Sequence, residues 1–229
     1  MTLLKVFTPV ARALLTLAVP VVLLFSPLYP LVTPAFVHWQ YTLPNVPPAD
    51  IYTPTERIRL SDPNLLFLRG RVSRDDLAAL RTDGGAIAMR SEEVQHMADV
   101  RAVMSSMYLA HGIALALALL CGGALWLAGR KDLLRRGLRQ GVAIVGALIG
   151  LILLSSVVDF DVFFTAFHGL FFEAGTWTFY ATDTLIQLYP LPFWMNAVIV
   201  YGALVLLGVA LVWGLSYCVR ERRATPVAA

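Results

Sequence analysis

Four long runs of apolar residues divide the chain, and polar segments of unequal length connect them. Each run is close to or above the about 20 residues that a helix needs to cross a hydrocarbon core about 30 Å thick. The pattern therefore predicts an all-α membrane protein with four transmembrane helices. The first run contains Pro20, Pro27, Pro30 and Pro34, so we expect it to be kinked and to end near Pro34. The expected segments are an N-terminus with the first helix (1–37), a small cap (38–101), the second helix (102–128), a short loop (129–139), the third helix (140–158), a second loop (159–192), the fourth helix (193–219) and a tail (220–229).

The cap is the only polar segment long enough to form a small domain. Two short amphipathic helices are expected in it, one at 55–60 that resumes at 64–68, and another at 73–81 with Ser73 as its N-cap. Asp83-Gly84-Gly85 is a turn signal, and the residues on either side could pair as a β-hairpin. The cap is too small for a large core of its own, so we expect it to rest on the membrane end of the bundle.

The second connection outside the membrane is aromatic and has no Lys or Arg. Residues 162–172 are uncharged apart from any protonation of His168, which suits the boundary between membrane and water. Residues 182–189 predict one short helix that Pro190 ends.

The distribution of Lys and Arg indicates on which side of the membrane each loop and terminus lies. Such residues crowd the 129–139 loop and follow the last apolar run, and Lys5 and Arg12 precede the first run. Because cytoplasmic loops carry an excess of Lys and Arg, both termini are expected in the cytoplasm. The cap and the aromatic loop are then extracytoplasmic, and the chain is a multi-pass protein of the bacterial cytoplasmic (inner) membrane.

Composition supports this interpretation and excludes others. Hydrophobic residues make up 58% and charged residues 14% of the chain, against about 45–50% and 25% in soluble proteins. The net charge of +3 comes largely from the cytoplasmic flanks, so nucleic-acid binding has little support. The first run is too long for a signal peptide, and no A-x-A-like cleavage site follows it. Cys121 and Cys218 lie inside predicted helices, where we expect small buried side chains and no disulfide.

Two histidines are placed to do chemistry together. His96 precedes the second apolar run on a helix that we expect to begin with Ser91 as N-cap, and His168 follows the third run. The second and third helices are joined by a short connection, which makes them antiparallel neighbours, so the two imidazoles could meet. Glu92 and Asp99 share a helical face with His96 and could orient its ring. His38 and His111 have no such neighbours, and we assign them no role.

Three other functions have partial support or none in the sequence. A metal-dependent hydrolase would use both histidines with Asp99 and Glu92, but the sequence has no H-E-x-x-H motif. A non-enzymatic lipid-binding scaffold or accessory subunit would tolerate loss of both histidines. A transporter is disfavoured because no charged residue lies deep inside a predicted span.

The motifs themselves resemble a known family. Residues 96–101, His-Met-Ala-Asp-Val-Arg, resemble the H-M-x-D-V-K/R motif of the lipoprotein intramolecular transacylase family. Residues 167–172, Trp177 and residues 182–190 resemble the second external loop of that family. The four-span plan with a cap also matches, so the resemblance extends over nearly the whole chain, with the cap as its least similar part.

The resemblance implies an acyltransferase whose substrates are diacylated bacterial lipoproteins. It would move the sn-2 acyl chain of a diacylglyceryl-modified N-terminal cysteine onto the α-amino group, which gives a lyso-form lipoprotein, and would meet membrane lipid. The resemblance assigns catalysis to His96 and His168. We expect no cofactor and no metal ion, and the oligomeric state is left open. The residues expected to support the histidines are Glu92, Asp99, Arg101 and Asp183, and those expected to form an aromatic wall are Phe171, Phe172, Trp177, Phe179 and Tyr180.

The residue types suit this reaction. Ester-to-amide transfer needs a base for the amine and an acid or donor for the ester oxygens. Imidazole, with an ordinary pKa near 6.5, can do either at neutral pH. We therefore expect one histidine to act as the base and the other to polarise the carbonyl or protonate the departing oxygen, with the two assignments open.

Overall fold

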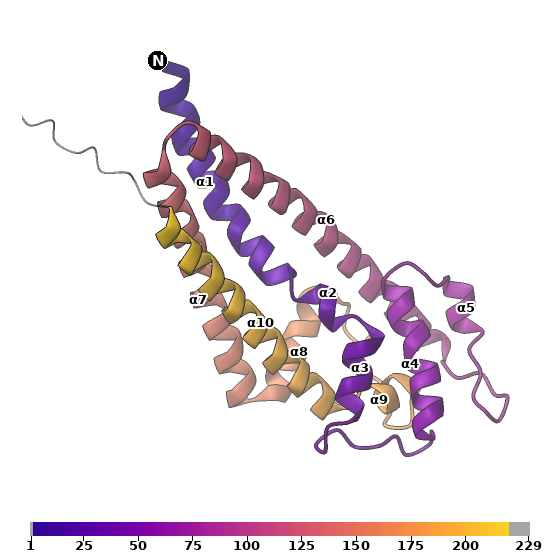
Figure 1. The fold of residues 1–229 in the computed structure, drawn as a ribbon. Coiled ribbons are helices and arrows are strands. Elements are labelled where there is room, and N and C mark those ends of the chain that lie inside the picture. Colours follow the sequence, from indigo (N-terminus) through magenta and orange to yellow (C-terminus); the bar gives the residue numbers. More distant parts are fainter. Residues whose placement is uncertain (1, 220–229) are drawn as a thin grey trace, which may run out of the picture. The chain divides into compact units, whose positions relative to one another are not determined.

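The computed structural model describes residues 2–219, so the predicted tail at 220–229 lies outside it. Apart from one isolated β-bridge, every regular element in this range is a helix (Figure 1). The helices are α1 (Thr2–Phe25), α2 (Leu28–Leu31), α3 (Pro34–Tyr41), α4 (Pro54–Leu68), α5 (Arg74–Ala78), α6 (Ser91–Leu127), α7 (Lys131–Val158), α8 (Phe160–Phe171), α9 (Thr184–Leu188) and α10 (Leu191–Cys218).

Among the described residues, four helical segments are long and apolar enough to cross a membrane, which confirms the predicted fold class. They are Phe7–Leu31, Ser91–Leu127, Lys131–Val158 and Leu191–Cys218. At 1.5 Å per residue, the 37 residues of α6 extend about 55 Å, well beyond a hydrocarbon core about 30 Å thick. The charged residues of α6 all lie in its first eleven residues. The start of the helix is therefore polar, and the rest of the helix is apolar.

The chain forms two compact units. The first contains residues 2–26, 109–150 and 203–219, and its helices approach closely at glycines. A Cβ atom on Gly141 of α7 would lie 2.7 Å from the Cβ of Val19 on α1, and one on Gly208 of α10 would lie 2.9 Å from a methyl of Leu23. Small residues of this kind let helix backbones approach in membranes, where packing drives association.

The first span is broken and short of Pro34, close to what was expected. α1 ends at Phe25, a turn at residues 26–27 separates it from α2, and the span ends at Leu31, three residues before Pro34, which begins α3. Proline fits the first turn of a helix because its missing N–H has no partner there in any case. Of the two thiols, Cys121 is buried as expected, but Cys218 is exposed.

The second unit, residues 27–108 and 151–202, contains the cap. α4 is one helix where two pieces were expected, because Pro63 is accommodated inside it; Thr53 caps its start by accepting from the Glu56 backbone N–H. Ser73 caps α5 in a capping box with Asp76, as predicted, although the helix ends at Ala78. The residues on either side of the 83–85 turn do pair, but through a single antiparallel bridge between Arg81 and Ile87 and not as two strands.

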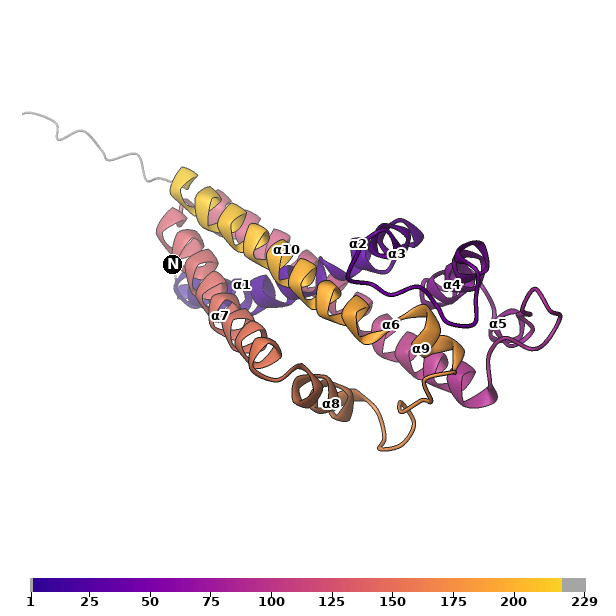
Figure 2. The same ribbon diagram turned by 90° about the horizontal axis from the view of Figure 1, so that it is seen from below.

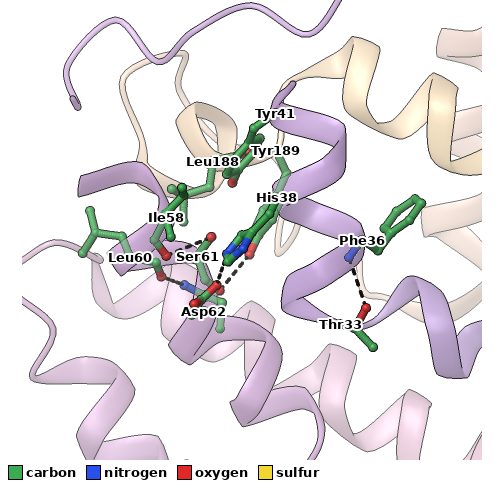
Figure 3. A network of polar contacts seen from close by, with 11 residues as sticks. Thr33, Phe36, His38, Tyr41, Ile58, Leu60, Ser61, Asp62, Leu188 and Tyr189 are labelled. Atoms are coloured by element: carbon green, nitrogen blue, oxygen red, sulfur yellow. Dashed lines mark hydrogen bonds and ion pairs between the residues drawn. The ribbon is translucent and has the colours of Figure 1, made fainter. Parts of the chain in front are cut away.

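One hydrophobic core joins α3, α4, the start of α6 and α9 (Figures 1 and 2). Polar contacts fasten α9 to the other helices: the Tyr41 hydroxyl and the Arg57 guanidinium both donate to the carbonyl of Leu188, at 3.0 and 3.1 Å. Nearby, His38 lies 2.7 Å from Asp62 (Figure 3). The end of the aromatic loop is therefore held firmly against the cap.

Candidate active site

The start of α6 is fixed by a buried carboxylate. The first helical hydrogen bond runs from the Val94 N–H to the Arg90 carbonyl, so Arg90 and not Ser91 is the N-cap, and that prediction was one residue out. The Glu93 side chain is fully buried and accepts two backbone hydrogen bonds, from Arg90 at 2.8 Å and from Leu185 at 2.7 Å. Since Leu185 belongs to α9, Glu93 fastens the aromatic loop to the start of α6.

This function of Glu93 was not predicted from the sequence. A Glu three residues after an N-cap commonly reaches back to the N-cap backbone N–H, in the second half of a capping box. The first half requires a short polar residue at the N-cap, and Arg90 occupies that position. The signal was therefore incomplete, and Glu92 and Glu93 appeared equivalent.

His96 follows Glu93 by one helical turn and is 9% exposed. Its Nδ1 atom is buried without a hydrogen-bond partner. His168 lies on α8, whose start is capped by the Asp159 carboxylate accepting from the Val162 N–H. The Nδ1 of His168 lies 2.8 Å from the Phe164 carbonyl oxygen, which can only accept. The neutral ring therefore carries its proton on Nδ1 and a lone pair on Nε2.

The structure brings the two imidazoles together, with ring centroids 6.4 Å apart and planes inclined by 25°. Phe172 contacts both rings, at 5.0 Å from His96 and 5.7 Å from His168. Phe179 lies 5.4 Å from His96, and Trp177 stacks on His168 at 4.8 Å. We call these five side chains, with Phe164, the aromatic cluster.

The surroundings of His168 favour its neutral form. Burial of the ring lowers the pKa of His168 below the ordinary value of 6.5, and the hydrogen bond to the Phe164 carbonyl opposes this shift. At neutral pH the Nε2 lone pair is therefore available to take a proton. An imidazole in this state can act as a general base.

Not every residue of the predicted aromatic wall reaches the histidines. Phe171 packs on Phe167 at 5.2 Å and is 39% exposed. Tyr180 is 71% exposed and lies beneath the Arg90 guanidinium. Conversely, Phe164 was not predicted, although its ring is 4.0 Å from that of His168. Its position four residues before His168 on one helix face was the available signal.

The predicted supporting residues make their hydrogen bonds and ring contacts with groups other than the two histidines. Glu92 is exposed and accepts from Ser91, and the Asp99 carboxylate accepts from Gln95 at 2.8 Å. Neither makes a hydrogen bond with His96. The remaining two also have other partners: Arg101 lies over the ring of Phe67, and Asp183 accepts from Arg90 and from the Tyr180 N–H. Within residues 2–219, no three His, Cys, Asp or Glu side chains gather as a metal site would require.

A sequence model of the family described as "Lipoprotein intramolecular transacylase Lit" matches residues 12–194. The chain belongs to the Lit family. Membership makes it an acyltransferase, and the lipoprotein in the family name gives the class of its substrate.

Solved structures agree with this Lit assignment at the level of the fold. The in meso structure of the membrane integral lipoprotein intramolecular transacylase Lit from Bacillus cereus is similar at a TM-score of 0.74 and 18% identity, over 94% of each chain. A structure of that protein with a histidine replaced by alanine gives 0.67 at 19% identity, over 95% of this chain and 96% of the other. An uncharacterised protein of Aquifex aeolicus (strain VF5) is 26% identical over 164 residues, or 70% of this chain and 72% of that protein. This Lit-family chain is therefore a bacterial membrane protein.

Proposed function

We propose that the enzyme moves the sn-2 acyl chain of a diacylglyceryl-modified N-terminal cysteine onto the α-amino group of that cysteine, with His96 and His168 as its acid–base pair. The observation that carries the proposal is the pair itself: two imidazoles 6.4 Å apart, surrounded by aromatic side chains. An ester oxygen and an amine can both reach one such pair, because a folded-back lipid head group brings them close together.

The two histidines take different parts. His168 has its Nδ1–H committed to the Phe164 carbonyl, so its Nε2 is the base that takes a proton from the amine. The N–C bond forms, the carbonyl π electrons move to oxygen, and on collapse the C–O bond to the glyceryl group breaks. His96, whose Nδ1 makes no hydrogen bond to the described chain, passes to the departing oxygen the proton that His168 has taken from the amine. One proton moves from nitrogen to oxygen overall, both imidazoles end neutral as they began, and the balance needs no co-reactant.

Positioning supplies more of the rate than proton transfer. General acid–base groups contribute about 10²–10⁴-fold. Well-oriented intramolecular reactions reach effective molarities of about 10⁵–10⁸ M. The aromatic cluster therefore matters as the surface on which the lipid head group folds, and a substitution that loosens it should reduce turnover.

The deciding experiment replaces each histidine of the chain by alanine. A reporter lipoprotein is recovered from cells that carry each variant and lack other N-acylation, and mass spectrometry locates its acyl chains. We expect no lyso-form with His96→Ala or His168→Ala. His38→Ala and His111→Ala are matched controls that should retain lyso-form, because those rings contact Asp62 and Ser26 instead. Lyso-form production by either of the first two variants, at wild-type level, would overturn the assignment.

The charge pattern supports an orientation for the substrate. We place both termini in the cytoplasm and the cap (38–101) and the aromatic loop (159–192) outside, where lipoproteins carry their modified cysteine. An alkaline phosphatase fusion within the 83–85 turn should be active, and one within the 129–139 loop inactive. The reverse result would contradict this orientation without affecting the roles of the histidines.

A further inference from the structure

One buried donor beside the histidines has no partner. The indole Nε1–H of Trp177 is inaccessible to solvent and makes no hydrogen bond. Buried polar groups in proteins are almost always paired, so each exception needs an explanation. An indole N–H can only donate, so its missing partner must be an acceptor.

Trp177 lies in the loop between α8 and α9, and its ring stacks on His168 with centroids 4.8 Å apart and planes inclined by 30°. The other ring beside it is that of Phe164, at 6.3 Å. The unpaired N–H therefore belongs to the side chain in contact with the proposed base. The N–H is out of contact with solvent, and away from water a single donor interacts strongly with a developing negative charge.

We propose that Trp177 is a further catalytic residue, whose Nε1–H donates to the carbonyl oxygen of the migrating acyl chain. This inference rests on the proposed function. As the amine nitrogen bonds to the carbonyl carbon, the π electron pair moves onto that oxygen, and the indole N–H stabilises the resulting oxyanion. The pair returns when the C–O bond to the glyceryl group breaks. The indole transfers no proton and is unchanged at the end.

If Trp177 served only to stack on His168, another aromatic residue could replace it. Stacking on His168 requires only an aromatic face, which phenylalanine also provides at positions 164 and 172. Burying an indole N–H without a partner costs free energy in the resting enzyme. A bound substrate carbonyl removes that cost, and the gain is largest when the oxygen is charged. The donor is then used most in the transition state, which raises kcat and leaves KM nearly unchanged.

The test separates the N–H from the ring. 3-Benzothienylalanine, placed at codon 177 alone by stop-codon suppression, keeps the bicyclic shape and replaces the N–H by sulfur; Trp177→Phe is the simpler companion. The purified enzyme is assayed with a synthetic diacylglyceryl-cysteinyl peptide, and the lyso-product is quantified by mass spectrometry. Trp194→Phe is the control, since its ring lies near Phe164, Tyr189 and Phe193 but contacts neither histidine.

With benzothienylalanine at 177 we expect kcat to fall about 10²–10³-fold, the range for loss of one oxyanion donor, and KM to change less than threefold. Wild-type kcat with this side chain, or a loss confined to KM, would overturn the inference. Thermal unfolding of the same sample identifies any loss due to misfolding, which the isosteric ring is chosen to avoid. His168→Ala in the same assay keeps the two proposals distinct: full activity there defeats the proposed function, whereas an inactive His168→Ala beside a fully active benzothienyl enzyme defeats only the role of Trp177.

Discussion

Replacing Glu93 by glutamine removes one carboxylate oxygen from a fully buried site where both oxygens accept backbone hydrogen bonds. The amide retains one acceptor and turns an NH₂ toward the other backbone N–H. A hydrogen bond to a charged group contributes about 1.5–3 kcal/mol, and leaving a buried donor unpaired costs a similar amount. We expect Glu93→Gln to weaken the attachment of α9 to α6 by about 1.5–3 kcal/mol, because one of the two bonds is lost.

Hydrogen exchange measures this attachment where it acts. A loss of about 1.5–3 kcal/mol should speed exchange of the Leu185 amide about 10- to 150-fold, and the peptide covering 184–188 should report it by mass spectrometry. Glu92→Gln is the matched control, because the Glu92 carboxylate is exposed and accepts a hydrogen bond from the adjacent Ser91 hydroxyl. Its exchange rates should change less than about twofold. Equal effects of the two substitutions would refute the buried position of Glu93.

Three more outcomes follow from the structure. If Nε2 of His168 is the base, the acidic limb of the kcat–pH profile should fall at a pH below 6.5, because burial lowers the pKa of that ring and only its neutral form takes a proton; a limb above 6.5 would contradict the assignment. Phe164→Ala should reduce kcat about tenfold by loosening the His168 ring, whereas Phe163→Ala, which contacts neither histidine, should leave lyso-form yield within twofold. Gly141→Ala should lower stability by about 1–3 kcal/mol, since its Cβ would overlap a side chain of α1. Gly146→Ala has open space and should not lower the melting temperature in detergent; equal melting shifts would contradict the close packing.

The four membrane-spanning helices could be predicted from the sequence, because the thickness of a bilayer requires long apolar runs that are plain in the order of residues. The sequence also brought His96 and His168 together, since the short connection between their helices makes them neighbours. Helix ends in the cap were harder to predict. The first cap helix was expected in two pieces, at 55–60 and 64–68, but α4 is continuous with Pro63 inside it, because the tolerance of an interior proline depends on packing that no periodicity encodes.

Aromatic residues posed a different difficulty. The sequence between 160 and 180 offers many rings at similar depth, and hydropathy ranks them alike. Whether a ring faces His168 depends on its angle around α8 and on the path of the loop, so Phe164 reaches the imidazole while Phe171 lies outward. Hydrogen bonds between distant segments are equally hard to predict from the sequence. No motif around Glu93 or Leu185 indicates that the two residues are in contact.

The position of Glu93 also bears on how the enzyme would lose activity. It lies one helical turn before His96, and its partner Leu185 lies in the first turn of α9, the helix that follows Trp177 and Phe179 along the chain. The segment that carries both rings is therefore attached at one end to α8 and at the other to the carboxylate beside His96. Loosening that attachment moves the rings relative to the histidine without unfolding the bundle. Turnover should thus fall before thermal stability does, because near-attack geometry is lost with shifts far smaller than those that break a helical core.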